Sequence, residues 1–324
     1  MSDVIERGTP AREREQRTTE EVPVVDLEKL RPSAFAIAYR MLGSVSDAED
    51  IVQQALLKLH QALEREHIRS PEAYLATVTT RLCIDELRSA RVKRETYIGE
   101  WLPEPLIDTG ERSGAARAEL SESVRMAFLV LLETLSPAQR AVFLLRDVFD
   151  YEYADIADIL GKSEAAVRQI AVRARAHVLE KRPRFDVGLE SQNELVDRFF
   201  AAIEGGDVAS LEALLAADVA LYGDGGGRVP ALGRPVNGRT AVARTLLNWS
   251  RTGARAGGFR AERTVVNQQP GALIRSADGS VVGVWAIDVV DGRIAAVRSV
   301  VNPDKLRHVP NAGNFGEWLR RALE

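Results

Sequence analysis

The chain has 324 residues, 45% of them hydrophobic, and a formal net charge of −4. This length predicts about two domains, or three if some are small, and the hydrophobic fraction is typical of globular proteins with buried cores. No apolar run is long enough to cross a membrane. Residues 1–25 are charged, do not resemble a signal peptide, and are predicted to be disordered, so we expect a cytoplasmic protein.

The cysteine count and the charge distribution restrict the chemistry. Cys83 is the one cysteine of the chain, which excludes an internal disulfide and a thiolate zinc site. We interpret it as a small buried residue of a helix, and we expect no cofactor or metal. Although the net charge is acidic, basic side chains cluster in residues 88–94 and again in residues 163–184. Such a bipolar chain can present one face to nucleic acid and another to a protein.

Residues 26–95 have the pattern of three helices, with apolar positions at helical spacing. The first helix is expected over 27–42 and should end at Gly43. A capping box of Ser46 and Glu49 is expected to start the second helix, and Ser70-Pro71 to start the third.

Residues 96–120 form a linker. The run from Trp101 to Leu106 cannot be helical, because each proline disfavours helix in the residue before it. A tryptophan among prolines in a linker has two interpretations that the sequence leaves open. It either docks incidentally on a neighbouring domain or makes a regulated contact.

Residues 121–184 have the pattern of a second helical unit that ends in a helix-turn-helix. Ser136, Pro137 and Gln139 form a capping box. Within residues 153–175, Gly161 ends one helix and Ser163 caps the next. The second helix of such a motif lies in the DNA major groove, where Arg and Gln pair with base edges.

Residues 190–324 begin with amphipathic helices and continue with β-rich runs. Asp278-Gly279 and Asp291-Gly292 between these runs predict hairpins. Helices followed by a run of antiparallel strands predict an α+β domain.

The two helical units resemble the promoter-melting and −35-reading domains of bacterial sigma factors of the extracytoplasmic-function class. The matching residues are Asp47–Gln54, then Tyr74, Leu75, Val78, Arg81, Asp85 and Arg88, and finally Leu135-Ser136-Pro137 through Arg175. Two matching units in the expected order, over roughly residues 26–182, make this resemblance more specific than a helix-turn-helix alone.

Three further segments are similar to motifs of sigma factors of the sigma factor J type, which carry a fused SnoaL-like domain. They are Trp101-Leu102-Pro103-Glu104-Pro105, Asp224-Gly225-Gly226-Gly227-Arg228 and Asn302-Pro303-Asp304-Lys305-Leu306. The resemblance implies two all-α domains followed by an α+β cone-shaped barrel. We expect the three segments to form an interdomain contact that regulates promoter binding.

The resemblance also implies partners, which are core RNA polymerase and promoter DNA. The acidic stripe Asp47, Glu49, Asp50, Gln53 and Gln54 is expected to dock on the clamp helices of the largest polymerase subunit, and the flap is the second expected polymerase contact. A solvated helix N-terminus would explain Asp47 and Glu49, but not the paired glutamines. The expected −10 contacts are His67, Arg81, Arg88, Arg91, Lys93 and Arg94, and the expected −35 contacts are Ser163, Glu164, Arg168, Gln169, Arg173, Arg175 and Lys181.

Other functions stay open at this point. The C-terminal domain could bind a small molecule as a sensor, or could be an enzyme with Asp224 and Asp288 as acids and Tyr222 and Trp285 as pocket walls. A fold that is shared with enzymes is only an analogy. A polymerase-independent helix-turn-helix regulator would instead bind duplex DNA without polymerase.

Overall fold

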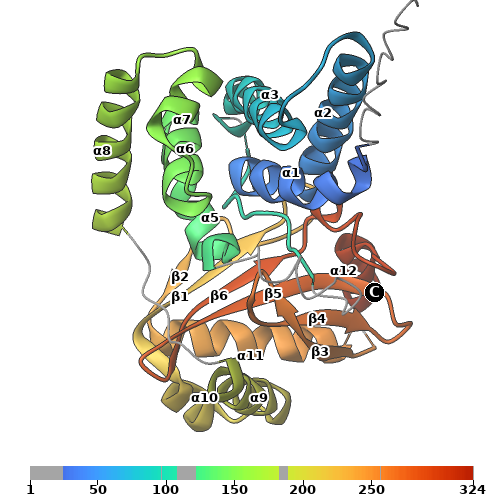
Figure 1. Cartoon of the computed structure of the whole chain (residues 1–324). Coiled ribbons are helices and arrows are strands. Elements are labelled where there is room, and N and C mark those ends of the chain that lie inside the picture. The colour runs from blue at the N-terminus through green and yellow to red at the C-terminus, as the bar shows by residue number, and fades with distance from the viewer. Residues whose placement is uncertain (1–24, 96, 108–121, 182–188, 256, 324) are drawn as a thin grey trace, which may run out of the picture.

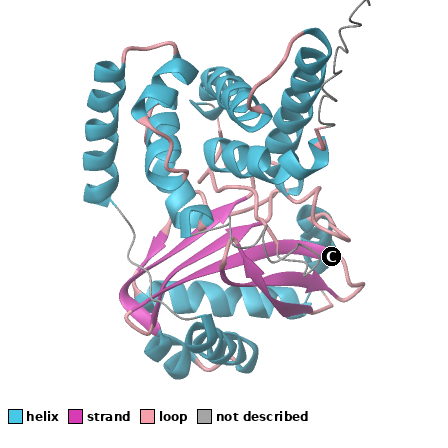
Figure 2. Cartoon of the chain, in the orientation of Figure 1, coloured by secondary structure: helices cyan, strands magenta, loops and turns pink. Residues whose placement is uncertain are grey.

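The computed structural model describes residues 25–95, 97–107, 122–181, 189–255 and 257–323. Two helical units lie over one face of a β-sheet, and further helices cover its opposite face (Figure 1). The expected arrangement of two all-α units followed by an α+β domain is confirmed (Figure 2). Of the residues predicted to be disordered, 1–25, residues 1–24 lie outside the described part of the chain.

The first helical unit contains α1 (Leu27–Leu42), α2 (Val45–Arg65) and α3 (Pro71–Glu95). Gly43 ends α1 in the left-handed conformation, as expected. The predicted capping box of α2 is wrong. Its N-cap is Ser44, whose side chain accepts from the Asp47 amide, while Glu49 forms an ion pair with Arg31.

The second helical unit confirms the expected capping box and helix-turn-helix. Ser136 and Gln139 cap α6 reciprocally, and Gly161 is left-handed between α7 and α8. The elements of this unit are η1 (Glu122–Val124), α5 (Met126–Leu132), α6 (Pro137–Phe143), η2 (Leu144–Val148), α7 (Tyr153–Leu160) and α8 (Glu164–Lys181).

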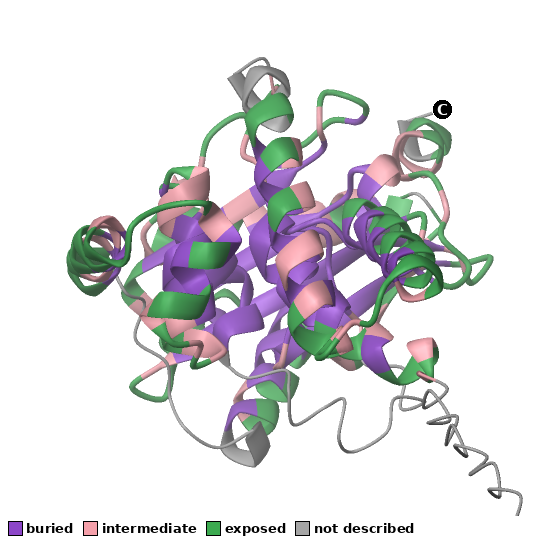
Figure 3. Ribbon diagram, turned by 45° about the horizontal axis from the view of Figure 1, so that its top comes forward, coloured by how far each residue is buried: buried purple, intermediate pink, exposed green. Residues whose placement is uncertain are grey.

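The two helical units share one hydrophobic core. Leu59 and Leu75 of the first unit belong to the same buried cluster as Phe128 and Leu132 of the second. Cys83 is buried in this shared core, as predicted. Burial raises the pKa of its thiol, against the opposing charge of Arg140 on α6. Figure 3 shows buried segments running from the helices into the sheet below them.

The C-terminal domain has a six-stranded sheet in the order β2-β1-β6-β5-β4-β3. The run of antiparallel strands that the sequence predicted is confirmed in β3 to β6, whereas β1 pairs with β6 in parallel. The domain contains α9 (Leu189–Gly205), α10 (Val208–Leu214), β1 (Leu215–Asp224), β2 (Val236–Asn237), α11 (Arg239–Arg255), β3 (Phe259–Val266), β4 (Gln269–Ser276), β5 (Val281–Val290), β6 (Arg293–Val300), η3 (Pro303–Lys305) and α12 (Phe315–Leu323).

Both faces of this sheet are buried, which explains why β5 is apolar almost throughout rather than alternating. On one face, Trp285 and Ile287 pack with residues of α9 and α11. On the other face, Val284 and Ala286 pack with Leu102 of the linker and Met126 of α5. The C-terminal domain is therefore joined to the helical part of the molecule through an apolar interface.

None of the described helices is long and apolar enough to cross a membrane. Within the same residues, no group of three or more His, Cys, Asp or Glu side chains is placed to hold a metal ion.

Candidate functional site

Residues 97–107, here called the strap, run between the first helical unit and the C-terminal domain. The strap is not helical, as the prolines predicted, and Leu102 to Leu106 are buried. The backbone is anchored at Gly43, whose carbonyl accepts from the Glu104 amide at 2.8 Å. The remaining predicted linker residues, 96 and 108–120, lie outside the described part of the chain.

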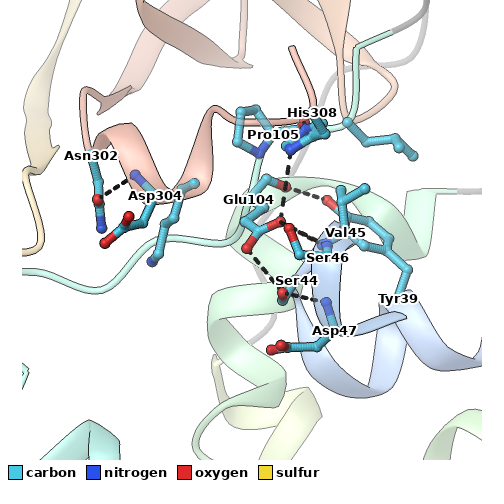
Figure 4. A network of polar contacts seen from close by, with 12 residues as sticks. Tyr39, Ser44, Val45, Ser46, Asp47, Glu104, Pro105, Asn302, Asp304 and His308 are labelled. Atoms are coloured by element: carbon cyan, nitrogen blue, oxygen red, sulfur yellow. Dashed lines mark hydrogen bonds and ion pairs between the residues drawn. The ribbon is translucent and has the colours of Figure 1, made fainter. Parts of the chain in front are cut away.

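Glu104 satisfies the exposed amides at the start of α2. Its carboxylate accepts from the amides of Val45 and Ser46, at 2.8 and 3.0 Å, and from the hydroxyl of Ser44 at 2.9 Å (Figure 4). The first turn of a helix carries unpaired N–H groups and favours negative charge. The strap therefore supplies part of the cap that the sequence assigned to Ser46 and Glu49.

The C-terminal domain holds the same strap through Asp224, which is fully buried. The Asp224 carboxylate accepts from the Leu102 amide at 2.8 Å and the Tyr97 hydroxyl at 2.5 Å, and pairs with the Lys305 ammonium at 2.7 Å. Burial, and then the charge of Asp224, raise the pKa of Tyr97, so its hydroxyl remains a donor. Each oxygen of this buried carboxylate has a partner.

The docking of Trp101 resolves part of the question that the sequence left open. The Lys305 ammonium lies 4.4 Å from the centroid of the Trp101 ring, and a Cβ added to Gly43 would come within 2.8 Å of that ring. His308 adds a contact through Nε2, 2.7 Å from the Pro105 carbonyl, and its Nδ1 lies 3.7 Å from the Glu104 carboxylate. Trp101 thus lies against both the first helical unit and the C-terminal domain.

The two other motif segments meet beside the strap. Gly226 has a φ of +58°, and a Cβ there would lie 2.1 Å from Nδ2 of Asn302, so a side chain does not fit. Asn302 donates to the Tyr97 hydroxyl at 3.0 Å and accepts from the Asp304 amide, which opens η3. The structure brings all three predicted segments together. The other members are Pro103, which is buried in the strap, Gly225 and Gly227 in the turn, Arg228 paired with Asp304 at 3.0 Å, Pro303 at the start of η3, and buried Leu306.

Asn267 is an interface residue that the sequence analysis missed. It lies at the tip of the β3–β4 hairpin with a φ of +52° and is buried. Its Oδ1 accepts from the Leu106 amide at 2.9 Å, and its Nδ2 donates to the Tyr39 hydroxyl at 2.6 Å and the Val124 carbonyl at 2.8 Å. One side chain therefore joins the strap and both helical units. An asparagine between two β-rich runs is the turn signal that could have identified it.

The two carboxylates considered for catalysis are both engaged in pairing. Asp224 is bound as described, and Asp288 forms an ion pair with Arg298 and accepts from Gln269 at 2.8 Å. Gln269 in turn accepts from the Met126 amide at 3.2 Å. Of the four residues considered, Trp285 lines the cavity of the C-terminal domain, whereas Asp224, Asp288 and Tyr222 do not. The carboxylates of Asp224 and Asp288 thus serve the contacts with the strap and α5.

The acidic stripe lies on the exposed face of α2. Asp47, Glu49, Asp50, Gln53 and Gln54 are all exposed, as a surface for a partner requires. Leu57, one turn further along α2, is 55% exposed. This face of α2 therefore presents acidic, amide and apolar side chains to solvent.

The recognition helix α8 presents most of its predicted −35 residues to solvent. Arg168 pairs with Glu164 and lies 4.4 Å from the centroid of the Tyr153 ring, while Arg175 pairs with Asp147 at 2.7 Å. Ser163 precedes α8, and its hydroxyl accepts from the Ala166 amide. The others, Gln169, Arg173 and Lys181, are exposed.

Arg81, predicted to contact the −10 element, lies between the two helical units. It donates to the carbonyls of Ile159 at 2.8 Å and Asp158 at 3.0 Å, at the C-terminal end of α7. Arg88 pairs with Asp85 on its own helix, and His67 is exposed. The side chains of Arg91, Lys93 and Arg94 lie outside the described residues.

Comparisons with known proteins agree with this geometry. Residues 27–92 match the family model Sigma-70 region 2, and residues 125–178 match Sigma-70, region 4. The chain is 38% identical to the ECF RNA polymerase sigma factor SigJ of Mycobacterium tuberculosis over 89% of this chain and 94% of that protein. It is 31% identical to the probable ECF RNA polymerase sigma factor SigI of the same species, over 83% and 90%.

A solved structure is similar over nearly the same length. The crystal structure of the Mycobacterium tuberculosis extracytoplasmic function sigma factor SigJ has a TM-score of 0.72 at 36% identity, covering 88% of this chain and 98% of that one. Both the sequence relatives and this structure span the helical units and the C-terminal domain together. The chain belongs to the extracytoplasmic-function family of RNA polymerase sigma factors.

Proposed function

We propose that the chain binds core RNA polymerase and directs it to promoters, and that its C-terminal domain restrains this activity in the same molecule. The exposed face of α2 docks on the clamp helices of the largest subunit, and the second helical unit contacts the flap. The end of α3 contacts the −10 element, and α8 contacts the −35 element. The family of the chain and the exposure of the predicted faces of α2 and α8 support this assignment.

The separation of the two promoter elements gives the restraint its physical basis. Elements centred about 25 base pairs apart lie roughly 85 Å apart at about 3.4 Å per base pair. In the structure, Arg81 of α3 instead contacts the end of α7, and the two units share a core. Promoter binding therefore requires that the two helical units separate.

The strap is the observation that carries the proposal. It is bound to the first helical unit by Glu104 and to the C-terminal domain by Asp224, while Asn267 reaches both helical units. While these contacts persist, the strap is held against the first helical unit and the C-terminal domain, and Asn267 keeps both helical units together. Breaking these contacts would allow the two helical units to separate, as promoter binding requires.

Transcription from the full chain and from chains ending at Arg184 and Val301 tests the restraint. Run-off assays with core polymerase should give more product per bound sigma factor when Asp224 is no longer held by Lys305, as in the chain ending at Val301. Binding to core polymerase is measured in parallel, so that loss of docking is distinguished from loss of restraint. Equal output from all three chains would contradict the restraint but not the sigma-factor assignment.

Polymerase dependence separates this proposal from an autonomous regulator. We expect weak duplex binding by the chain alone and strong promoter binding only with core polymerase. The matched control replaces Gln53 and Gln54 on α2 with alanine, which should reduce polymerase binding without affecting the strap. Tight, sequence-specific binding without polymerase would favour the autonomous regulator instead.

A further inference from the structure

The C-terminal domain carries a basic surface on the helix α11. Residues 225–261 contain seven arginines and no aspartate or glutamate. Three of these arginines, Arg244, Arg251 and Arg255, are exposed on α11. Their spacing places them on one face of the helix, together with the exposed Asn248. These four residues are here called the basic face.

The arginines of the basic face are not neutralised by the fold. Among the described residues, none forms an ion pair or a side-chain hydrogen bond with them. The helices α9 and α10 pack beside α11 and carry acids, but Asp197 of α9 pairs with Arg263 of β3, at 3.1 Å. The other paired arginines of this domain are Arg228, Arg260, Arg275, Arg298 and Arg307.

This distribution of charge does not stabilise α11. Arg251 and Arg255 are four residues apart on the helix, a spacing at which like charges repel. Arg239 lies in the first turn, where the helix dipole disfavours positive charge. A helix face that is merely solvated commonly mixes charges of both signs, whereas α11 has four arginines and no acid. The basic face therefore indicates an anionic partner.

The basic face lies away from the strap. Val242 and Leu246 of α11 pack in the same cluster as Trp285, on one face of the sheet, whereas Leu102 of the strap packs on the other face. Figure 1 shows α11 on the side of the sheet opposite to the helical units. The exposure of the basic face thus does not depend on the strap contacts.

A short connection joins the recognition helix α8 to the C-terminal domain. Seven residues separate Lys181 from Leu189, and a segment of that length spans at most about 30 Å. When α8 lies on the −35 element, the C-terminal domain therefore stays beside the same DNA at a high effective concentration. From Arg244 to Arg255 the helix rises by about 16 Å, which is the length of roughly five base pairs of duplex.

We propose that the basic face binds the phosphate backbone of DNA next to the −35 element, on the side away from the −10 element. The inference rests on the proposed function, in which the first helical unit and the polymerase lie on the −10 side. Guanidinium groups donate in pairs to phosphate oxygens, and the Asn248 amide adds a neutral donor. Such contacts depend on charge rather than on base sequence. An acidic surface of the polymerase is the alternative partner.

Binding of the full chain with core polymerase to two duplexes tests the inference, both made from a promoter that it uses in the run-off assay. The long duplex extends about two helical turns beyond the −35 element, and the short duplex ends directly after that element. Three phosphate contacts steepen the salt dependence by about 2.7 units, so a fourfold rise in salt should weaken the long complex about fortyfold more than the short one. Scrambling the added sequence should not change this difference.

Two triple variants separate charge from structure. The variant with Arg244→Ala, Arg251→Ala and Arg255→Ala should bind both duplexes with the same salt dependence. The variant with lysine at the same three positions keeps the charge and should retain most of the difference between the duplexes. Because these side chains are exposed and unpaired, both variants should melt close to the temperature of the unmodified chain.

Three results would overturn the inference. The first is an equal salt dependence of the unmodified chain on the two duplexes, and the second is a difference that the alanine variant retains. The third is weaker binding of the alanine variant to core polymerase without DNA, which would assign the basic face to the polymerase instead. Binding to the short duplex tests the proposed function separately, so that proposal stands if only the basic face fails.

Discussion

The strap interface and the recognition helix α8 are both rich in charged side chains, but they differ in how those charges are paired. Asp224 and Glu104 are buried and bound from several sides by other parts of the chain. The arginines of α8 are largely exposed, and Arg168 is paired with a glutamate of its own helix. Buried charges without partners are costly, whereas exposed pairs contribute little. The interface is therefore complete within the chain, while α8 retains the capacity to bind something else.

Of the substitutions proposed here, replacement of Asp224 should cause the largest loss in the free energy of unfolding. Asp224→Ala leaves the Lys305 ammonium buried without its counter-charge, and we expect a loss of about 3–5 kcal/mol in the free energy of unfolding. Urea denaturation measures this loss. The labelling rate of Cys83 by a thiol reagent reports separation of the helical units, because the thiol is buried in their shared core.

Two controls sharpen the interpretation of that variant. Arg228→Ala breaks the exposed pair with Asp304 in the same region, and should cost about 0–1 kcal/mol. The double variant Asp224→Ala with Lys305→Met removes both buried charges and should be more stable than Asp224→Ala alone. If Asp224→Ala behaved like Arg228→Ala, the buried pair would not hold the strap.

Asn267→Ala should have the next largest effect. It leaves the Leu106 amide and the Val124 carbonyl without their buried partner, and we expect a cost of about 2–3 kcal/mol with faster labelling of Cys83. Asn311→Ala is the matched control, because Asn311 has a similar φ of +57° but is exposed. Equal effects of both variants would mean that backbone strain, rather than the interface, accounts for the loss.

On the other side of the comparison, Arg168 and Arg175 should differ in DNA binding. Arg168→Ala is expected to cost about 1–2 kcal/mol of preference for the cognate −35 sequence, the magnitude of one base contact. Arg175→Ala should weaken binding to all sequences and lower the salt dependence by about one unit. Competition between cognate and scrambled duplexes for the holoenzyme measures both. An equal loss on the two duplexes for Arg168→Ala would exclude a base-reading role.

Local signals predicted the helices well. Gly43, Gly161 and the Ser136 capping box mark element ends through interactions within a few residues, and each lies where the sequence placed it. The prediction for the cap of α2 was wrong because the partner of its first amides, Glu104, is about sixty residues away in the strap. The local pattern assigned the cap to Ser46 and Glu49, whereas in the fold Glu104 of the strap accepts from the amides of Val45 and Ser46.

Most of the interface residues that could be predicted from the sequence belong to the three motif segments. The three motif segments were expected to meet, and they do. Asn267 and His308 lie outside them, and of these two only Asn267 carried a local signal, as an asparagine between two β-rich runs. The parallel pairing of β1 with β6 and the helix α12 were also missed. Pairing between distant strands, and a short terminal helix that covers a cavity, depend on tertiary packing that periodicity does not encode.

Arg81 gives the smallest expected effect, and it tests the boundary between the two regions directly. Its guanidinium donates to two carbonyls at the end of α7, so Arg81→Ala should cost about 1 kcal/mol of contact between the helical units. A difference of that size corresponds to roughly a fivefold faster labelling of Cys83. Arg88→Ala, on an exposed face of the same helix, should leave the labelling rate unchanged.

The effect of Arg81→Ala on transcription depends on whether Arg81 acts mainly at the interface between the helical units or mainly on DNA. If Arg81 acts at the interface, it stabilises the arrangement in which the two helical units are in contact. Arg81→Ala then raises promoter-dependent transcription by the full chain. As a phosphate contact, Arg81 supports the open complex, and its loss lowers transcription and the salt dependence of promoter binding by about one unit. A residue that serves both states shows faster labelling together with weaker promoter binding. Because the two promoter elements lie far apart, Arg81 can bind α7 only before the units separate, and the paired measurements therefore assign its role in each state.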